Sequence, residues 1–224
     1  MGLDLYVGAL TRYYAGHCEA GPGGEEAMLL PPEIRRAVLV WRDGLSVGLQ
    51  AYLEDPLDWD ESASAPCFRG SLDWEGYAGL LLWAAYAEHP ELERPLAPAV
   101  EWESDPAWQA SNAQGFESRY GQLLYGPELW LPCPFGFTFR AADPWDDEVT
   151  IGSSLALLAE LEALNAATWA ADAPTVKAWR RAGPPQGEPT LEGCARHGFA
   201  VFLGLAERSA SHALPMVLDL APAS

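Results

Sequence analysis

The residues from Tyr77 to Ala87 form the most apolar run of the chain, and this run constrains the fold more than any other segment. Its eleven residues are too few to cross a lipid bilayer, which takes about 20. Asp73 stands where a helix N-cap is expected, and His89-Pro90 marks the expected end. The run therefore predicts a helix that is buried in a protein core.

Length and composition set the size of that core. The chain has 224 residues, of which 49% are hydrophobic and ten are tryptophan. A chain of this length can bury one substantial core, and so high a hydrophobic content favours a folded protein over a disordered one. We therefore expect a single globular domain that spans residues 1–224.

Alternating apolar residues predict strands near both ends and in the middle of the chain. These strands are expected at residues 3–10, 129–140, 148–151 and 215–220, with a short piece at Cys67-Phe68. Leu3, Leu5 and Val7 share one face of the first strand. Prolines divide the second strand into two pieces, and the third strand returns as its hairpin partner. We expect the last strand beside the first.

Capping residues predict where the helices begin. The expected starts are Pro31-Pro32, Asp73, Ser153 or Ser154, Asp172 and Thr190. Gly44 and Gly48 weaken the first of these helices, so a break near residue 44 stays open. Together these patterns predict an α+β fold. Its small mixed or antiparallel sheet has an N-terminal strand, a central hairpin and a C-terminal strand, and it is packed with about five helices.

Negative charge is concentrated in the middle of the chain. The formal net charge is −19, and residues 54–148 alone hold nineteen Asp or Glu against four Arg. Four tryptophans in this segment have acidic neighbours. From these triplets we take a candidate partner surface of Trp59, Asp60, Trp74, Glu75, Trp102, Glu103, Trp145, Asp146 and Asp147. The competing interpretation is that each tryptophan anchors the core while its acidic neighbours face solvent.

An acidic surface with aromatic rings suits a cationic partner, through ion pairs and cation–π contacts. Our leading hypothesis is a non-enzymatic binding protein for a basic protein partner. An inhibitor or immunity-like protein that acts on a cationic toxin or nuclease is of this kind.

The alternative hypothesis is a small-molecule hydrolase with a pocket near the end of the first strand. Arg12, Tyr13, Tyr14 and His17 follow that strand, and the side chains of Tyr13, Tyr14 and His17 can act as general acids or bases. Ser46 is a second candidate, because residues 44–48 match the G-x-S-x-G nucleophile pattern. A pocket that joins the first strand's end to the Asp143–Glu148 turn would favour this hypothesis.

Several other classes of function are disfavoured. The net charge opposes direct binding of nucleic acid, because phosphate contacts need cations. There is no P-loop, no G-x-G-x-x-G and no C-x-x-C pair, so we expect no cofactor and no metal. No secretory signal or membrane span is visible, and we therefore expect a cytoplasmic protein.

Four segments resemble an uncharacterised family of bacterial proteins. They are Met1-Gly2-Leu3-Asp4-Leu5-Tyr6-Val7-Gly8, Leu10-Thr11-Arg12-Tyr13-Tyr14, Val149-Thr150-Ile151-Gly152-Ser153 and Leu214-Pro215-Met216. The resemblance runs the length of the chain and implies an intact, single-domain bacterial protein. It implies no activity, cofactor or catalytic residue.

Overall fold

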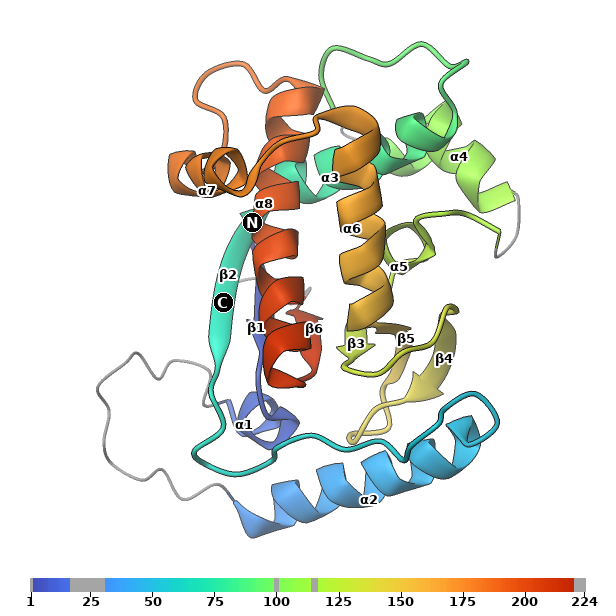
Figure 1. Cartoon of the computed structure of the whole chain (residues 1–224), viewed down its shortest axis with the longest axis vertical. Coiled ribbons are helices and arrows are strands. Elements are labelled where there is room, and N and C mark those ends of the chain that lie inside the picture. Colours follow the sequence, from blue (N-terminus) through green and yellow to red (C-terminus); the bar gives the residue numbers. More distant parts are fainter. Residues whose placement is uncertain (1, 17–30, 99–100, 114–116, 220–224) are drawn as a thin grey trace.

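The computed structural model describes residues 2–16, 31–98, 101–113 and 117–219 (Figure 1). Within these ranges six strands form one mixed sheet. The strands are β1 (Gly2–Val7), β2 (Phe68–Asp73), β3 (Leu129–Leu131), β4 (Phe139–Ala142), β5 (Glu148–Ser153) and β6 (Met216–Asp219). The helices are α1 (Leu10–Tyr14), α2 (Pro32–Leu49), α3 (Trp74–Glu88), α4 (Pro106–Ala113), α5 (Gly121–Leu124), α6 (Ser154–Thr168), α7 (Ala173–Ala182), α8 (Leu191–His212) and the short 3-10 helix η1 (Trp102–Ser104).

The first and last strands are neighbours inside the sheet. The strand order is β2-β1-β6-β3-β5-β4. β1 runs antiparallel to β6, with Leu5 opposite Leu218 and Tyr6 opposite Val217. β4 and β5 form the predicted antiparallel hairpin, whereas β3 and β5 run parallel. The expected pairing of the first and last strands is therefore confirmed.

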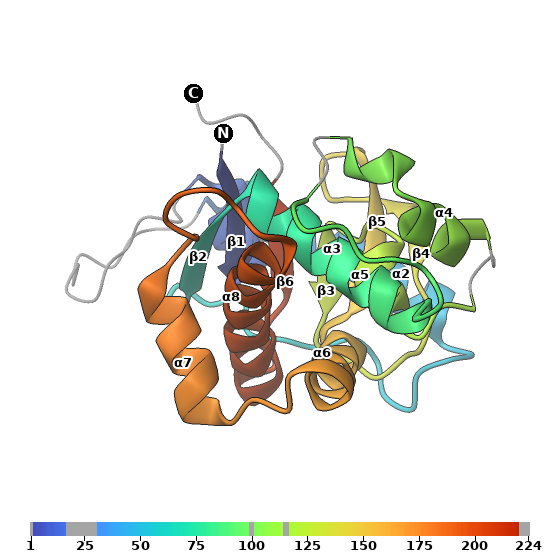
Figure 2. The ribbon, with the colours of Figure 1, turned by 90° about the horizontal axis from the view of Figure 1, so that it is seen from above.

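Three helices cover one face of the sheet. β1 turns Leu3, Leu5 and Val7 toward this side, and all three are fully buried in its core. Figure 2 shows α3, α6 and α8 together here. α3 is buried on almost every side because its sequence is apolar all round. Gly198 of α8 touches α3 so closely that a Cβ there would lie 2.3 Å from the carbonyl oxygen of Gly76.

The opposite face of the sheet has a separate core under α2, which runs along the bottom of Figure 1. Tyr6, Leu129 and Ile151 contribute to it from the strands, and Val38 contributes from α2. The irregular segment 50–67 lies against α2 and completes the layer. The protein thus has three layers, with the sheet in the middle.

The capping predictions are confirmed at four helices. Asp73 accepts a hydrogen bond from the first turn of α3, and Ser153 does the same for α6. Asp172 caps α7, and Thr190 caps α8. In each case the side-chain oxygen takes an N–H group that has no partner inside the helix.

The predicted sheet was too small and the predicted number of helices too low, because the described residues form a six-stranded sheet and eight α-helices. β2 is a full strand of six residues, where only a short piece at Cys67-Phe68 was expected. α1 and α5 were not predicted at all, and α2 continues through Gly44 without a break. β2 exists because it pairs with β1 and lies under α8, where a Cβ on Gly70 would come within 2.9 Å of Leu205. Across the described ranges, none of the helices is both long and apolar enough to span a membrane.

Candidate functional site

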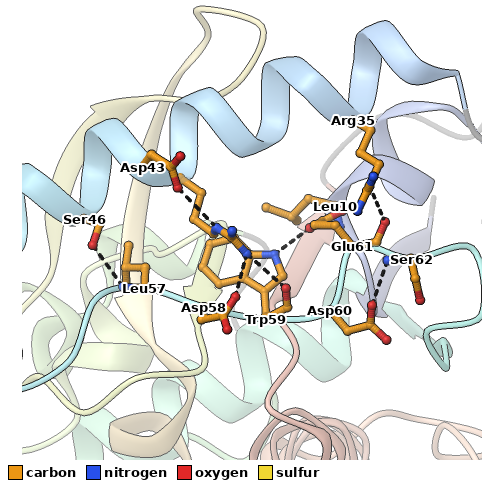
Figure 3. Close-up of polar contacts among 11 residues, drawn as sticks. Leu10, Arg35, Asp43, Ser46, Leu57, Asp58, Trp59, Asp60, Glu61 and Ser62 are labelled. Carbon is orange, nitrogen blue, oxygen red and sulfur yellow. Dashed lines mark hydrogen bonds and ion pairs between the residues drawn. The ribbon is translucent and has the colours of Figure 1, made fainter.

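α1 has five residues and receives its N-terminal support from another part of the chain. The Glu61 carboxylate is 3% exposed and accepts the backbone N–H groups of Leu10 at 2.9 Å and Thr11 at 2.8 Å. It also accepts the indole N–H of Trp59, as Figure 3 shows. Because the first N–H groups of a helix lack intrahelical partners, this carboxylate anchors α1 to the segment 57–62.

That segment is held in turn on α2. The Ser46 hydroxyl accepts the backbone N–H of Leu57 at 3.0 Å (Figure 3). Arg42 donates to the Asp58 carboxylate and to the carbonyl oxygen of Trp59, both at 3.0 Å. Ser46 lies inside a continuous helix and not on the strand-to-helix turn that a G-x-S-x-G nucleophile needs. The Ser46 hydroxyl therefore holds the segment 57–62 on α2 and is not placed as the nucleophile of a G-x-S-x-G site.

The turn between β4 and β5 supplies the other half of the site. The Asp143 carboxylate, 8% exposed, accepts the backbone N–H groups of Trp145 at 2.7 Å and Asp147 at 3.0 Å. Asp146 adopts a left-handed backbone with φ of 65°, which the short polar side chain of Asp tolerates. The other oxygen of Asp143 accepts the hydroxyl of Tyr14 at 2.8 Å. One hydrogen bond thus joins α1 to a turn 129 residues away.

Aromatic rings line the space between α1 and this turn. Tyr14 and Trp145 stack with ring centroids 4.5 Å apart and planes 9° from parallel. Tyr13 meets Tyr14 edge-on, with centroids 5.1 Å apart. These three residues line a cavity of about 620 Å³, which we call the α1–turn cavity. Its charged lining residues are Arg69, Glu128, Asp143, Asp147 and Asp219.

The α1–turn cavity is electrostatically negative. Four of its five charged lining residues are carboxylates, and the guanidinium of Arg69 pairs with Asp4 at 3.3 Å. Burial, and then the carboxylate of Asp143, raise the pKa of Tyr14 above its ordinary value. The phenol of Tyr14 therefore keeps its proton at neutral pH and acts as a donor. Such a cavity favours a positively charged guest.

The four tryptophans of the predicted partner surface differ in burial. Trp59 is 6% exposed and belongs to the core under α2, so the expectation of a surface ring is wrong there. The ring packs in that core, and the indole N–H can be buried there because it donates to the carboxylate of Glu61. Trp74 and Trp102 are half-buried, and both pack edge-on against Tyr77 on the other side of the sheet.

Trp145 is the tryptophan of this set that reaches the surface, with 46% of its area exposed. The five acidic residues of the predicted partner surface are exposed: Asp60, Glu75, Glu103, Asp146 and Asp147. The core interpretation is therefore correct for Trp59, whereas Trp145 lies at the surface and its contact with a partner stays a prediction. Within the predicted partner surface, Trp145 and Asp147 are the residues that line the α1–turn cavity.

The alternative pocket is assembled only in part. Tyr13 and Tyr14 line the α1–turn cavity, but Arg12 donates to the carbonyl oxygen of Ala63 at 2.6 Å and does not line it. His17 lies outside the described residues.

Sequence reasoning missed three charged residues of the cavity. Arg69 and Asp219 lie on the strands β2 and β6, and Glu128 immediately precedes β3. They reach the cavity because β2, β6 and β3 lie close together in the sheet, in the order β2-β1-β6-β3. No local sequence pattern indicates that order. No family model matches the chain, and comparison with curated proteins and with solved structures found no significantly similar protein.

Proposed function

We propose that this chain is a non-enzymatic binding protein for a basic protein partner, and that the α1–turn cavity takes a cationic side chain of that partner. The observation that carries the proposal is the stacked pair of Tyr14 and Trp145 at a cavity whose lining residues include four acids. An aromatic face attracts a cation through its ring quadrupole, and carboxylates add Coulombic attraction.

The charge of the whole chain supports the same proposal. A net charge of −19 speeds encounter with a basic protein over distances comparable to the Debye length. The partially exposed ring of Trp145 then offers the kind of aromatic anchor that binding hot spots use. A cationic toxin or nuclease is a suitable partner, for which this chain would act as an inhibitor or immunity-like protein.

Calorimetric titration with a short peptide of Arg, Lys and Gly tests the proposal. We expect binding at about 20 mM NaCl that weakens at least about tenfold at about 300 mM, because added salt shortens the Debye length. Trp145→Ala and Asp147→Asn should each weaken binding at low salt. Both side chains are exposed, so the variants should fold, and thermal denaturation checks this.

Two further variants separate the cavity from the general charge. Glu162→Gln removes one exposed charge from α6, on the other face of the sheet, and should leave binding unchanged. Glu103→Gln tests whether the partner surface extends beyond the cavity. Equal weakening by Asp147→Asn and Glu162→Gln would show that diffuse charge binds the peptide and would contradict a role for the cavity.

One observation favours a second candidate function. The α1–turn cavity joins the end of the first strand to the Asp143–Asp147 turn, where a small-molecule hydrolase site was expected. In this candidate Tyr13 and Tyr14, which line the cavity, supply the general acid or base. Hydrolysis of a panel of ester and amide substrates that is lost in Tyr14→Phe would support it, and an inactive parent protein would remove it.

A further inference from the structure

We infer that the group bound by the α1–turn cavity is a guanidinium, the side chain of an arginine on the partner, stacked on the ring of Trp145. This inference rests on the proposed function and names the chemistry of the cation. An ammonium group and a guanidinium both carry one positive charge, but only the guanidinium is planar. The shape of the aromatic surface and the positions of the acids decide between them.

The ring of Trp145 is a flat surface that the protein holds in place. Tyr14 covers one side of it, at 4.5 Å between ring centroids and 9° between planes. The hydroxyl of Tyr14 and the backbone N–H of Trp145 both bind the buried carboxylate of Asp143, so the two rings share one support. In the described part of the chain no other ring stacks on Trp145, which is 46% exposed. A planar cation can therefore lie parallel to the indole at little cost in ordering.

The acids around the cavity suit several directed donors. Asp143 already accepts three hydrogen bonds, which ties it to the turn and to α1. Asp147 is exposed in the turn before β5 and lines the same cavity. Glu128, which immediately precedes β3, also lines it and accepts the backbone N–H of Thr150 at 3.3 Å. A guanidinium presents five N–H donors in one plane and can serve carboxylates at its edge while its face stacks on a ring. An ammonium is a compact point charge that uses no flat surface.

The chain contains the same combination within its own fold. The guanidinium of Arg42 lies over the ring of Trp59, with its carbon 5.4 Å from the ring centroid. Its nitrogen donates at 3.0 Å to the carboxylate of Asp58 and to the carbonyl oxygen of Trp59. This internal site combines an indole with an acidic partner, as the α1–turn cavity does. Among the described residues that line the α1–turn cavity, the one cation is Arg69, and it pairs with Asp4. No described cation of the lining therefore takes the place that Arg42 has beside Trp59.

Three peptides of identical sequence except for one central residue test the inference. The residue is arginine, lysine or citrulline, and citrulline keeps the planar shape of arginine without its charge. Calorimetry on the full chain at about 20 mM NaCl should give the arginine peptide about tenfold tighter binding than the lysine peptide. The citrulline peptide should bind too weakly to measure. Trp145→Ala should reduce arginine binding to the level of lysine, and Glu162→Gln should not change it.

The outcomes separate the inference from the proposed function. Equal affinity for arginine and lysine would overturn the choice of guanidinium and leave a cation-binding cavity. Arginine binding that survives Trp145→Ala would also overturn the inference, because the peptide would then bind elsewhere. Failure of both charged peptides to bind would refute the proposed function itself.

Discussion

The substitution Glu61→Ala is expected to lower the free energy of unfolding by about 3 kcal/mol, although the residue lies in a loop. Its buried carboxylate accepts the N–H groups of Leu10 and Thr11 and the indole N–H of Trp59. A buried donor left without a partner costs about 1–3 kcal/mol. Three such donors would therefore lower the free energy of unfolding by at most about 9 kcal/mol. Water can enter the space that the carboxylate leaves and bind some of these donors, so the expected loss lies at the lower end.

Urea unfolding followed by tryptophan fluorescence measures this loss. With a slope of about 3 kcal/mol per M, the midpoint should fall by about 1 M. The control is Asp60→Asn, because this exposed carboxylate accepts one backbone N–H, from Ser62 at 2.8 Å, and its loss should cost under about 1 kcal/mol. Hydrogen exchange at Leu10 and Thr11 should speed up only in Glu61→Ala. A Glu61→Ala protein within about 0.5 kcal/mol of the parent would show that α1 does not depend on this carboxylate.

Three further predictions concern stability. Burial raises the pKa of Glu160 from 4.5 to about 8, so the folded state binds this proton more tightly than the unfolded chain does. The contribution of this group to the free energy of unfolding should be greatest below about pH 4.5 and should be lost as pH rises through about 8. Urea unfolding at several pH values should give a flatter dependence of stability on pH in Glu160→Gln, and equal dependence in the two proteins would contradict this. Gly48→Ala should raise the melting temperature because a Cβ there meets open space, while Gly198→Ala should lower it by overpacking against α3; shifts of the same sign would refute the packing argument. Trp59→Ala should cost about 3–5 kcal/mol in chemical denaturation and Trp145→Ala less than about 1, since only the latter ring is exposed, and equal costs would refute the assignment of core and surface.

The helix starts could be predicted because their signals are local. Asp73, Ser153, Asp172 and Thr190 each precede the helix whose first turn they cap. A cap needs only a short polar side chain two or three residues from the N–H it accepts, so sequence alone reveals it. The alternation in β1 is local for the same reason.

The extent of the sheet depended on contacts far apart in the chain. β2 has the sequence Phe-Arg-Gly-Ser-Leu-Asp, which carries no clear alternation of apolar residues. Its place in the sheet comes from pairing with β1 and from the close packing of α8 over Gly70. α1 likewise depends on Glu61, which lies 51 residues beyond Leu10 in the sequence.

The kinds of side chain available to the site can be read from the sequence, but which of them meet depends on how the strands and helices pack. Aromatic and acidic residues in the Tyr13-Tyr14 segment and in the turn around Trp145 can be read directly. The hydrogen bond from Tyr14 to Asp143, which brings the two segments together, cannot be predicted from the sequence, because it depends on how β1, β6 and the β4–β5 hairpin assemble. The same acid-flanked pattern also produces a buried Trp59 and an exposed Trp145. Burial of a ring depends on what packs against it in space, and its neighbours in the chain do not specify that.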